Sequence, residues 1–454
     1  MCLQLILFLV LAPDSYNPVY AAGKKDDNGV YNQDVIDNYR QLVKKLQTDN
    51  GPFDPRLSDP LLGLGQALKN GGNYAEAADI FRRAMYIKRV NNGLYDLDQI
   101  TILENVIECN TALHNWDEVD DEYQYLLWIF EKAYPEPDPA RLAALEEVIN
   151  WHLTAFTLSS ETLPAQHLIT ARDLNKNAVE LAEQLYGSSS RETASRLYKL
   201  ALAEYYIAVG IQHGGPDGLA LADSLLIMNR NPSYYSMSLK LVAKIYRKGV
   251  RLLRRIIDIY SDAGAAEPWG EAMAMVYLAD WNLLFNKQRT AARLYKDAYE
   301  TFMDSGGNSA LIDNYFSKPV LLPLEEFIPK PDTFILPEHI QVQFEKTGDE
   351  PGYIRNLNKY PLISWSGSLP GLAYPATTTA GVIPFPNNSY AVAGFDVSKK
   401  GLAEKIRILD YQSHDVMTRK RAYDMLWSMQ FRPRLVKGRP VYSRDYRLRY
   451  TLPE

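Results

Sequence analysis

Residues 59–84 read DPLLGLGQALKNGGNYAEAADIFRRA, and the pattern of this stretch recurs along much of the chain. Asp59 can cap a helix, and Pro60 suits the first helical position because its missing N–H needs no partner there. Gly72 then interrupts the helical spacing before a second run of small and apolar residues begins. The stretch therefore predicts two helices joined by a tight turn.

The small and apolar residues of this stretch lie on one face of each predicted helix. Small residues let two helices approach closely, and larger ones fill the space between them. The predicted packing residues are Leu61, Leu64, Gly65, Tyr74, Ala77, Phe81 and Ala84. Their pattern resembles the tetratricopeptide repeat. The resemblance implies an all-α solenoid over residues 55–305 whose usual role is to hold a peptide or a partner protein.

The pattern recurs further along the chain. Leu61, Leu103 and Leu145 follow one another at steps of 42 residues. The common tetratricopeptide step is about 34 residues, so each helix here is expected to be about one turn longer. The last clear unit falls within residues 275–298.

A basic amphipathic segment lies inside the predicted array, from Ser238 to Tyr260. Its Lys and Arg residues alternate with Leu, Ile and Val. Such a helix can bind an anionic membrane or a nucleic acid. A repeat helix with one solvated face has the same pattern, and we favour this reading because the segment lies among repeats.

The charge of the chain is distributed unevenly. The 454 residues carry a net charge of −6, but residues 395–454 hold 14 basic and 7 acidic side chains and are therefore positive. The length predicts two or three domains. A basic tail on an acidic body can face an acidic partner or an anionic envelope surface, or it can simply be solvated.

Between residues 306 and 388 the composition changes, because prolines become too frequent for helices of normal length. We expect a Pro-rich linker there. Residues 339–345 alternate like a half-buried strand, and a second run ends at residue 357. Residues 339–357 are therefore either a decayed copy of the tail module or extra strands of its sheet.

The tail, residues 389–454, predicts a strand, a turn at Gly401, a second strand, a short helix from Thr418 and a last strand at 446–450. Residues 431–433 (FRP) are expected to end the helix, because Pro disfavours α geometry in the residue before it. Residues 438–441 (GRPV) are expected to turn the chain toward the last strand.

Together these motifs resemble the C-terminal domain of TonB-like proteins of the Gram-negative envelope. The resemblance implies a small α+β domain that docks onto a partner, for example by strand addition. The candidate contact residues are Arg432, Arg434, Arg439, Arg447 and Arg449. Strand edges also carry Arg simply to prevent aggregation. The chain has no rigid Pro-Lys spacer, so we do not expect an energy-transducing role.

The first residues predict export. The run from Leu3 to Ala12 is far shorter than the ~20 residues that span a bilayer, but it suits the core of a signal peptide. We expect a cleaved signal peptide at residues 1–22, a lead-in at 23–54, a periplasmic location and no stable transmembrane anchor.

No catalytic motif is evident. The six histidines do not form a known metal-binding spacing, and there is no nucleophile elbow or phosphate-binding loop. We therefore expect no catalytic residues, cofactor, metal or nucleic acid. The predicted function is an exported, non-enzymatic adaptor or scaffold that binds protein partners in the envelope. The alternatives are an envelope hydrolase with an unrecognised site and a cytoplasmic scaffold.

Overall fold

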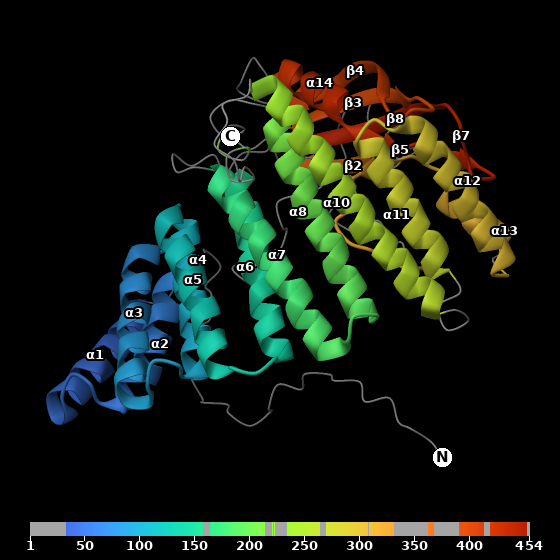
Figure 1. The fold of residues 1–454 in the computed structure, drawn as a ribbon. Coiled ribbons are helices and arrows are strands. Elements are labelled where there is room, and N and C mark those ends of the chain that lie inside the picture. The colour runs from blue at the N-terminus through green and yellow to red at the C-terminus, as the bar shows by residue number, and fades with distance from the viewer. Residues whose placement is uncertain are drawn as a thin grey trace. The chain divides into compact units, whose positions relative to one another are not determined.

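The structure, a computed structural model, describes residues 33–157, 164–213, 220, 222, 234–263, 269–306, 308–330, 362–366, 390–412 and 418–451. These residues fall into two compact units, of which the first ends at Leu113 and the second begins at His114 (Figure 1). The predicted signal peptide and the predicted strands at 339–357 lie outside the described residues. Among the described helices, none is long and apolar enough to cross a membrane.

The first unit consists of helices that pack in sequence order. They are α1 (Gln33–Asn50), η1 (Pro55–Leu57), α2 (Ser58–Asn70), α3 (Tyr74–Asn92), η2 (Leu97–Gln99) and α4 (Ile100–Ala112). The predicted helix pair is present as α2 and α3, and Gly72 joins them with a φ of 77° that favours glycine. Helix α1 lies within the predicted lead-in at 23–54.

The face shared by α2 and α3 is closely packed. Leu61, Leu64, Gly65, Ala77, Phe81 and Ala84 are buried, and Tyr74 is half-buried. A Cβ atom added to Gly65 would lie 2.5 Å from the ring of Phe81. The glycine therefore allows the two helices to approach until the aromatic ring covers its backbone.

The second unit begins with eight helices, each packed against the next along the described chain (Figure 1). They are α5 (Trp116–Ala133), α6 (Pro139–Thr157), α7 (Pro164–Tyr186), α8 (Arg191–His213), α10 (Tyr234–Ala263), α11 (Gly270–Leu284), α12 (Gln288–Asp304) and α13 (Ser309–Tyr315). This succession of paired helices is a tetratricopeptide-like array.

The basic segment of the sequence forms most of α10 and has one solvated face. Leu241, Ile245, Leu253, Ile256 and Ile259 are buried in the array. Lys244, Arg247, Arg251 and Arg254 are exposed. The amphipathic pattern is therefore that of a repeat helix that packs on its apolar side.

The array does not end where the prolines begin, because residues 309–328 pack against it. Tyr198 of α8 donates a hydrogen bond to the carbonyl of Leu324 at 2.6 Å, and Tyr277 of α11 donates one to the carbonyl of Glu326 at 2.8 Å. The ring of Phe327 is buried beside these tyrosines. Prolines exclude long helices here, but an extended segment can still bury its apolar side chains.

The tail has the predicted order of two strands, a helix and a strand. Its sheet has the strand order β2-β8-β3-β4, and only β2 and β8 are parallel. Its elements are β3 (Tyr390–Val397), β4 (Ala403–Gln412), α14 (Thr418–Ser428) and β8 (Ser443–Thr451), and the predicted linker adds the outer strand β2 (Leu362–Ser366). Helix α14 packs on β3 and β4 over a core that includes Phe395, Leu426 and Phe431.

Two turns of the tail depend on glycine. Gly401 has a φ of 75° in the β3–β4 turn, and a Cβ there would lie 2.0 Å from the carbonyl oxygen of Phe431. Gly438, with a φ of 71°, lies in the turn between β6 (Leu435–Val436) and β7 (Arg439–Pro440).

Residues 431–433 do not end α14, which finishes at Ser428. Phe431 and Arg432 instead belong to strand β5 (Gln430–Arg432), which pairs with β1 (Val320–Leu322).

Strand β5 joins the tail to the helical array through side chains that point in opposite directions. Successive residues of a strand face opposite sides, so Phe431 enters the core of the tail while Arg432 enters the array. The guanidinium binds both carboxylate oxygens of Asp280 on α11, with Nε 2.9 Å from Oδ1. It also donates to the Tyr315 hydroxyl at 2.7 Å, and Tyr295 donates to Asp280 Oδ1 at 2.6 Å.

This ion pair lies in the interior, because Arg432 is 1% exposed. Burial disfavours the charged guanidinium, but Asp280 and the surrounding hydroxyls outweigh burial and raise the pKa of Arg432 well above its ordinary value. Each nitrogen of the guanidinium and each oxygen of the carboxylate has a hydrogen-bond partner, which is the condition under which a buried ion pair is tolerated.

Removing one partner of this pair should destabilise the second unit. We expect Arg432→Ala and Asp280→Ala each to lower the free energy of unfolding by about 3–5 kcal/mol, because each leaves the other charge buried and unpaired. The double variant should lose much less than the sum of the two. Urea unfolding followed by circular dichroism measures all three values.

The matched control is Arg434→Ala, two residues away on the exposed side of the same segment. It should change the free energy of unfolding by less than about 0.5 kcal/mol. Equal effects of the Arg432 and Arg434 substitutions would contradict the structural role of the pair.

The buried tyrosines predict a loss of stability at high pH. Burial raises the pKa of Tyr198, Tyr205, Tyr206, Tyr277, Tyr295 and Tyr315. The unfolded chain releases these protons near pH ~10, whereas the folded chain keeps them. Stability is therefore retained below about pH 10 and falls as the pH rises above it.

Tyr206→Phe tests this directly, because the Tyr206 hydroxyl is buried and has no hydrogen-bond partner among the described residues. Its removal should shift the alkaline unfolding midpoint to higher pH, as followed by circular dichroism and phenolate absorbance. The exposed Tyr423, when changed to Phe, should leave the midpoint unchanged. A midpoint that does not move in the Tyr206 variant would refute the explanation.

Candidate functional site

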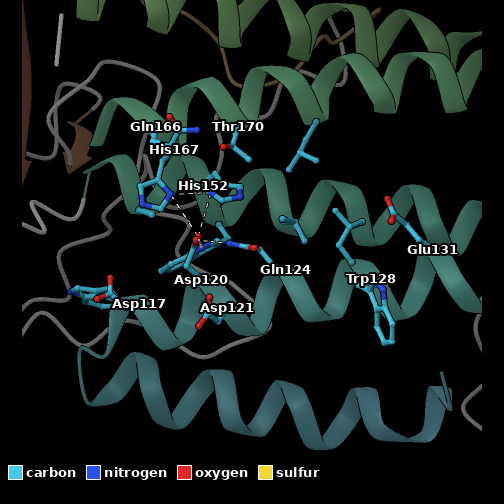
Figure 2. A pocket seen from close by; sticks show the side chains of 16 residues that line it. Asp117, Asp120, Asp121, Gln124, Trp128, Glu131, His152, Gln166, His167 and Thr170 are labelled. Carbon is cyan, nitrogen blue, oxygen red and sulfur yellow. Dashed lines mark hydrogen bonds and ion pairs between the residues drawn. The ribbon is translucent and has the colours of Figure 1, made fainter. Parts of the chain in front are cut away.

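Helices α5, α6 and α7 of the second unit enclose an open pocket with a volume of about 750 Å³ (Figure 2). One stripe of each helix lines it. On α5 the stripe includes Asp117, Asp121, Gln124, Trp128 and Glu131, which recur at alternating steps of four and three residues and therefore share one face. Because this face carries carboxylates and an indole, it is suited to contact with a ligand.

The inner end of the pocket brings one carboxylate and two imidazoles together (Figure 2). His152 Nδ1 on α6 lies 2.9 Å from His167 Nδ1 on α7. Asp120 Oδ1 on α5 lies 3.5 Å from the first of these nitrogens and 3.7 Å from the second. Two ring nitrogens and one carboxylate oxygen thus face one another across the three helices, and at 2.9 Å one of the two Nδ1 atoms donates a hydrogen bond to the other.

Neighbouring side chains fix the Asp120 carboxylate in place. Trp151 Nε1 donates a hydrogen bond to Oδ1 at 2.8 Å, and Gln124 Nε2 donates one to Oδ2 at 2.9 Å. The Trp151 ring is itself buried and stacks on Tyr123 with a centroid distance of 5.3 Å. These two hydrogen bonds hold both oxygens of the carboxylate and keep it facing the imidazoles.

Both imidazoles are held in their neutral form. Burial lowers the pKa of His152 to about 4 and also lowers the pKa of His167, although the nearby Asp120 carboxylate acts in the opposite direction. A neutral imidazole has one ring nitrogen with a free lone pair, so each ring can accept a proton or bind a cation.

The structure places the five predicted tail arginines in different environments. Arg432 is buried against Asp280, so the prediction that it contacts an outside partner is wrong for the folded chain. Arg434 and Arg439 are exposed, and Arg447 is half-buried. Arg447 and Arg449 lie on β8, which is paired on both sides by β2 and β3 and is not a sheet edge. The outer strands of the described sheet are β2 and β4.

The Asp120, His152 and His167 cluster was not found from the sequence. The sequence predicts no metal ligands, because none of the histidines has a familiar spacing. These three residues lie on three different helices, 32 and 15 positions apart. The repeat pattern predicts that these helices lie side by side. It does not predict how they are rotated and shifted relative to one another, and this decides which side chains meet.

Comparisons with known proteins identify only distant structural likenesses. No protein-family model and no curated protein matches the chain. One similar solved structure is that of a putative kinesin light chain with nearly identical TPR-like repeats from Podosopora anserina; it has 14% identity and a TM-score of 0.30, over 48% of this chain and 87% of that chain. Another is BtubC (BKLC) from P. vanneervenii, with 12% identity and a TM-score of 0.29, over 61% of this chain and 92% of that chain.

Proposed function

We propose that the chain is an exported, non-enzymatic protein-binding adaptor of the bacterial envelope. The helical array would hold one partner and the basic tail would dock onto another. The observation that carries this proposal is the acidic, tryptophan-lined pocket on α5–α7, set in an array of paired helices. Arrays of this kind generally act by binding other proteins.

The pocket suits a short basic segment of a partner. Its volume of about 750 Å³ is in the range of pockets that enclose a few side chains and is too small for a folded domain. Asp117, Asp121 and Glu131 are exposed along the pocket and would attract Lys or Arg. Trp116 and Trp128 offer aromatic faces on which a cation or an apolar side chain can pack.

The tail would contribute a second, oppositely charged binding surface. Arg434 and Arg439 are exposed there, and so are the apolar side chains of Tyr423 and Trp427 on α14, of which Trp427 is 65% exposed. The strand-strand-helix-strand order supports a TonB-like docking module. Strand β4 lies at one edge of the described sheet and could pair with a strand of the partner.

Neutralising the pocket should weaken binding of basic peptides. A peptide library selected on the purified chain should be enriched in Lys and Arg. A variant carrying Asp117→Asn, Asp121→Asn and Glu131→Gln should bind the selected peptides about 10- to 100-fold more weakly, because each lost charge pair contributes on the order of 1 kcal/mol. Fluorescence anisotropy of a labelled peptide measures the affinity.

The matched control carries Glu180→Gln, Asp262→Asn and Asp304→Asn, which are exposed carboxylates outside the pocket. Its net charge is the same as that of the pocket variant, so general electrostatic attraction changes equally in both. An equal loss of affinity in the two variants would show that the pocket is not the binding site. Turnover of hydrolase substrates that is abolished by a pocket substitution would favour the enzyme alternative.

Export can be tested separately in cells that make the protein. We expect the mature chain in the periplasmic fraction, with an N-terminus created by cleavage near residue 22. Cell fractionation followed by N-terminal sequencing measures both properties. A cytoplasmic chain that retains Met1 would support a cytoplasmic scaffold instead and would leave the peptide-binding result unaffected.

A further inference from the structure

The inner end of the α5–α7 pocket has the geometry of a metal site. The three distances among Asp120 Oδ1, His152 Nδ1 and His167 Nδ1 are 2.9, 3.5 and 3.7 Å. A triangle with these sides has a centre about 2.0 Å from each corner, which is the distance at which Zn²⁺ binds imidazole nitrogen and carboxylate oxygen. A single ion close to this centre would therefore reach all three atoms without moving the helices.

The donor set selects a class of ion. Two imidazole nitrogens and one carboxylate oxygen suit divalent transition metals, whereas Mg²⁺ and Ca²⁺ prefer oxygen ligands throughout. Catalytic and exchangeable zinc sites often have three protein ligands and one open position. All three residues line the pocket, so a water molecule or a side chain of a partner can provide the fourth ligand.

Surrounding residues hold this arrangement as they do around known metal ligands. Gln124 and Trp151 each bind one oxygen of Asp120, which leaves the carboxylate facing the two rings. Such outer partners commonly orient ligands and raise the affinity of a site. His152 is 4% exposed and His167 is half-buried, so both rings are fixed by helix packing.

We propose that Asp120, His152 and His167 bind one divalent transition-metal ion, with Zn²⁺ as the first candidate. The ion would neutralise part of the negative charge at the inner end of the pocket. It would also join α5, α6 and α7 at one point. The metal site shares the pocket with the proposed peptide site but uses different side chains from Asp117, Asp121 and Glu131, so metal binding can be measured without any peptide.

The test uses the untagged full chain after removal of metals with a chelator. Isothermal titration should show one Zn²⁺ bound per chain, and Co²⁺ should give the visible absorption of a site with nitrogen ligands. Asp120→Asn and His167→Gln should each weaken Zn²⁺ binding by more than about 100-fold. Trp151→Phe, which removes only a positioning hydrogen bond, should weaken it by about 10- to 100-fold and keep the cobalt spectrum.

His114→Asn is the matched control, because His114 is exposed and asparagine tolerates its φ of 58°. Zn²⁺ affinity should not change in this variant, and Mg²⁺ should not compete. His152→Gln replaces a buried ring, so circular dichroism must first show that this variant folds; if it does not, the Asp120 and His167 variants decide. Absence of Zn²⁺, Fe²⁺ and Co²⁺ binding, or unchanged affinity in both variants, would overturn the proposal.

Discussion

The buried ion pair between Arg432 and Asp280 is the interaction on which the second unit depends. It joins residues 152 positions apart and connects strand β5 of the tail to helix α11 of the array. Because β5 is a strand, the same backbone segment sends Phe431 into the tail core. The tail is therefore part of the body that the helices form. Separating them would expose two charges and their hydroxyl partners, Tyr295 and Tyr315.

Polar groups inside the second unit serve two different purposes. Around Asp280 every buried charge has a bidentate or hydroxyl partner, so this network specifies how the tail and the array fit together. Around Asp120 the partners are also fixed, but the atoms face a pocket. The groups around Asp280 bind one another within the chain, whereas the Asp120 carboxylate and its two imidazole neighbours can bind a ligand. This contrast is why we assign structure to Arg432 and binding to the α5–α7 pocket.

Local sequence patterns predicted the elements well, but they did not predict contacts between distant elements. The helix pair around Gly72, the hairpin turn at Gly401 and the order of elements in the tail depend on neighbouring residues, and the structure contains all three. The burial of Arg432 depends on a partner on α11. The Asp120 cluster depends on the register of three helices. The prolines after residue 306 gave no sign that tyrosine hydroxyls hold residues 324–328 against the array.

We have proposed that the acidic face of α5 contacts a basic segment of another protein. Site-specific photo-crosslinking in cells that make the protein tests it most directly, with a photoreactive residue in place of Trp128 in the pocket and, for comparison, in place of the exposed Tyr423 on α14. We predict that Trp128 cross-links to one Lys- or Arg-rich segment, identified by mass spectrometry, and that the charge-neutralised pocket variant loses this product. A product that persists in that variant, or pocket cross-links only to acidic or randomly distributed segments, would contradict it.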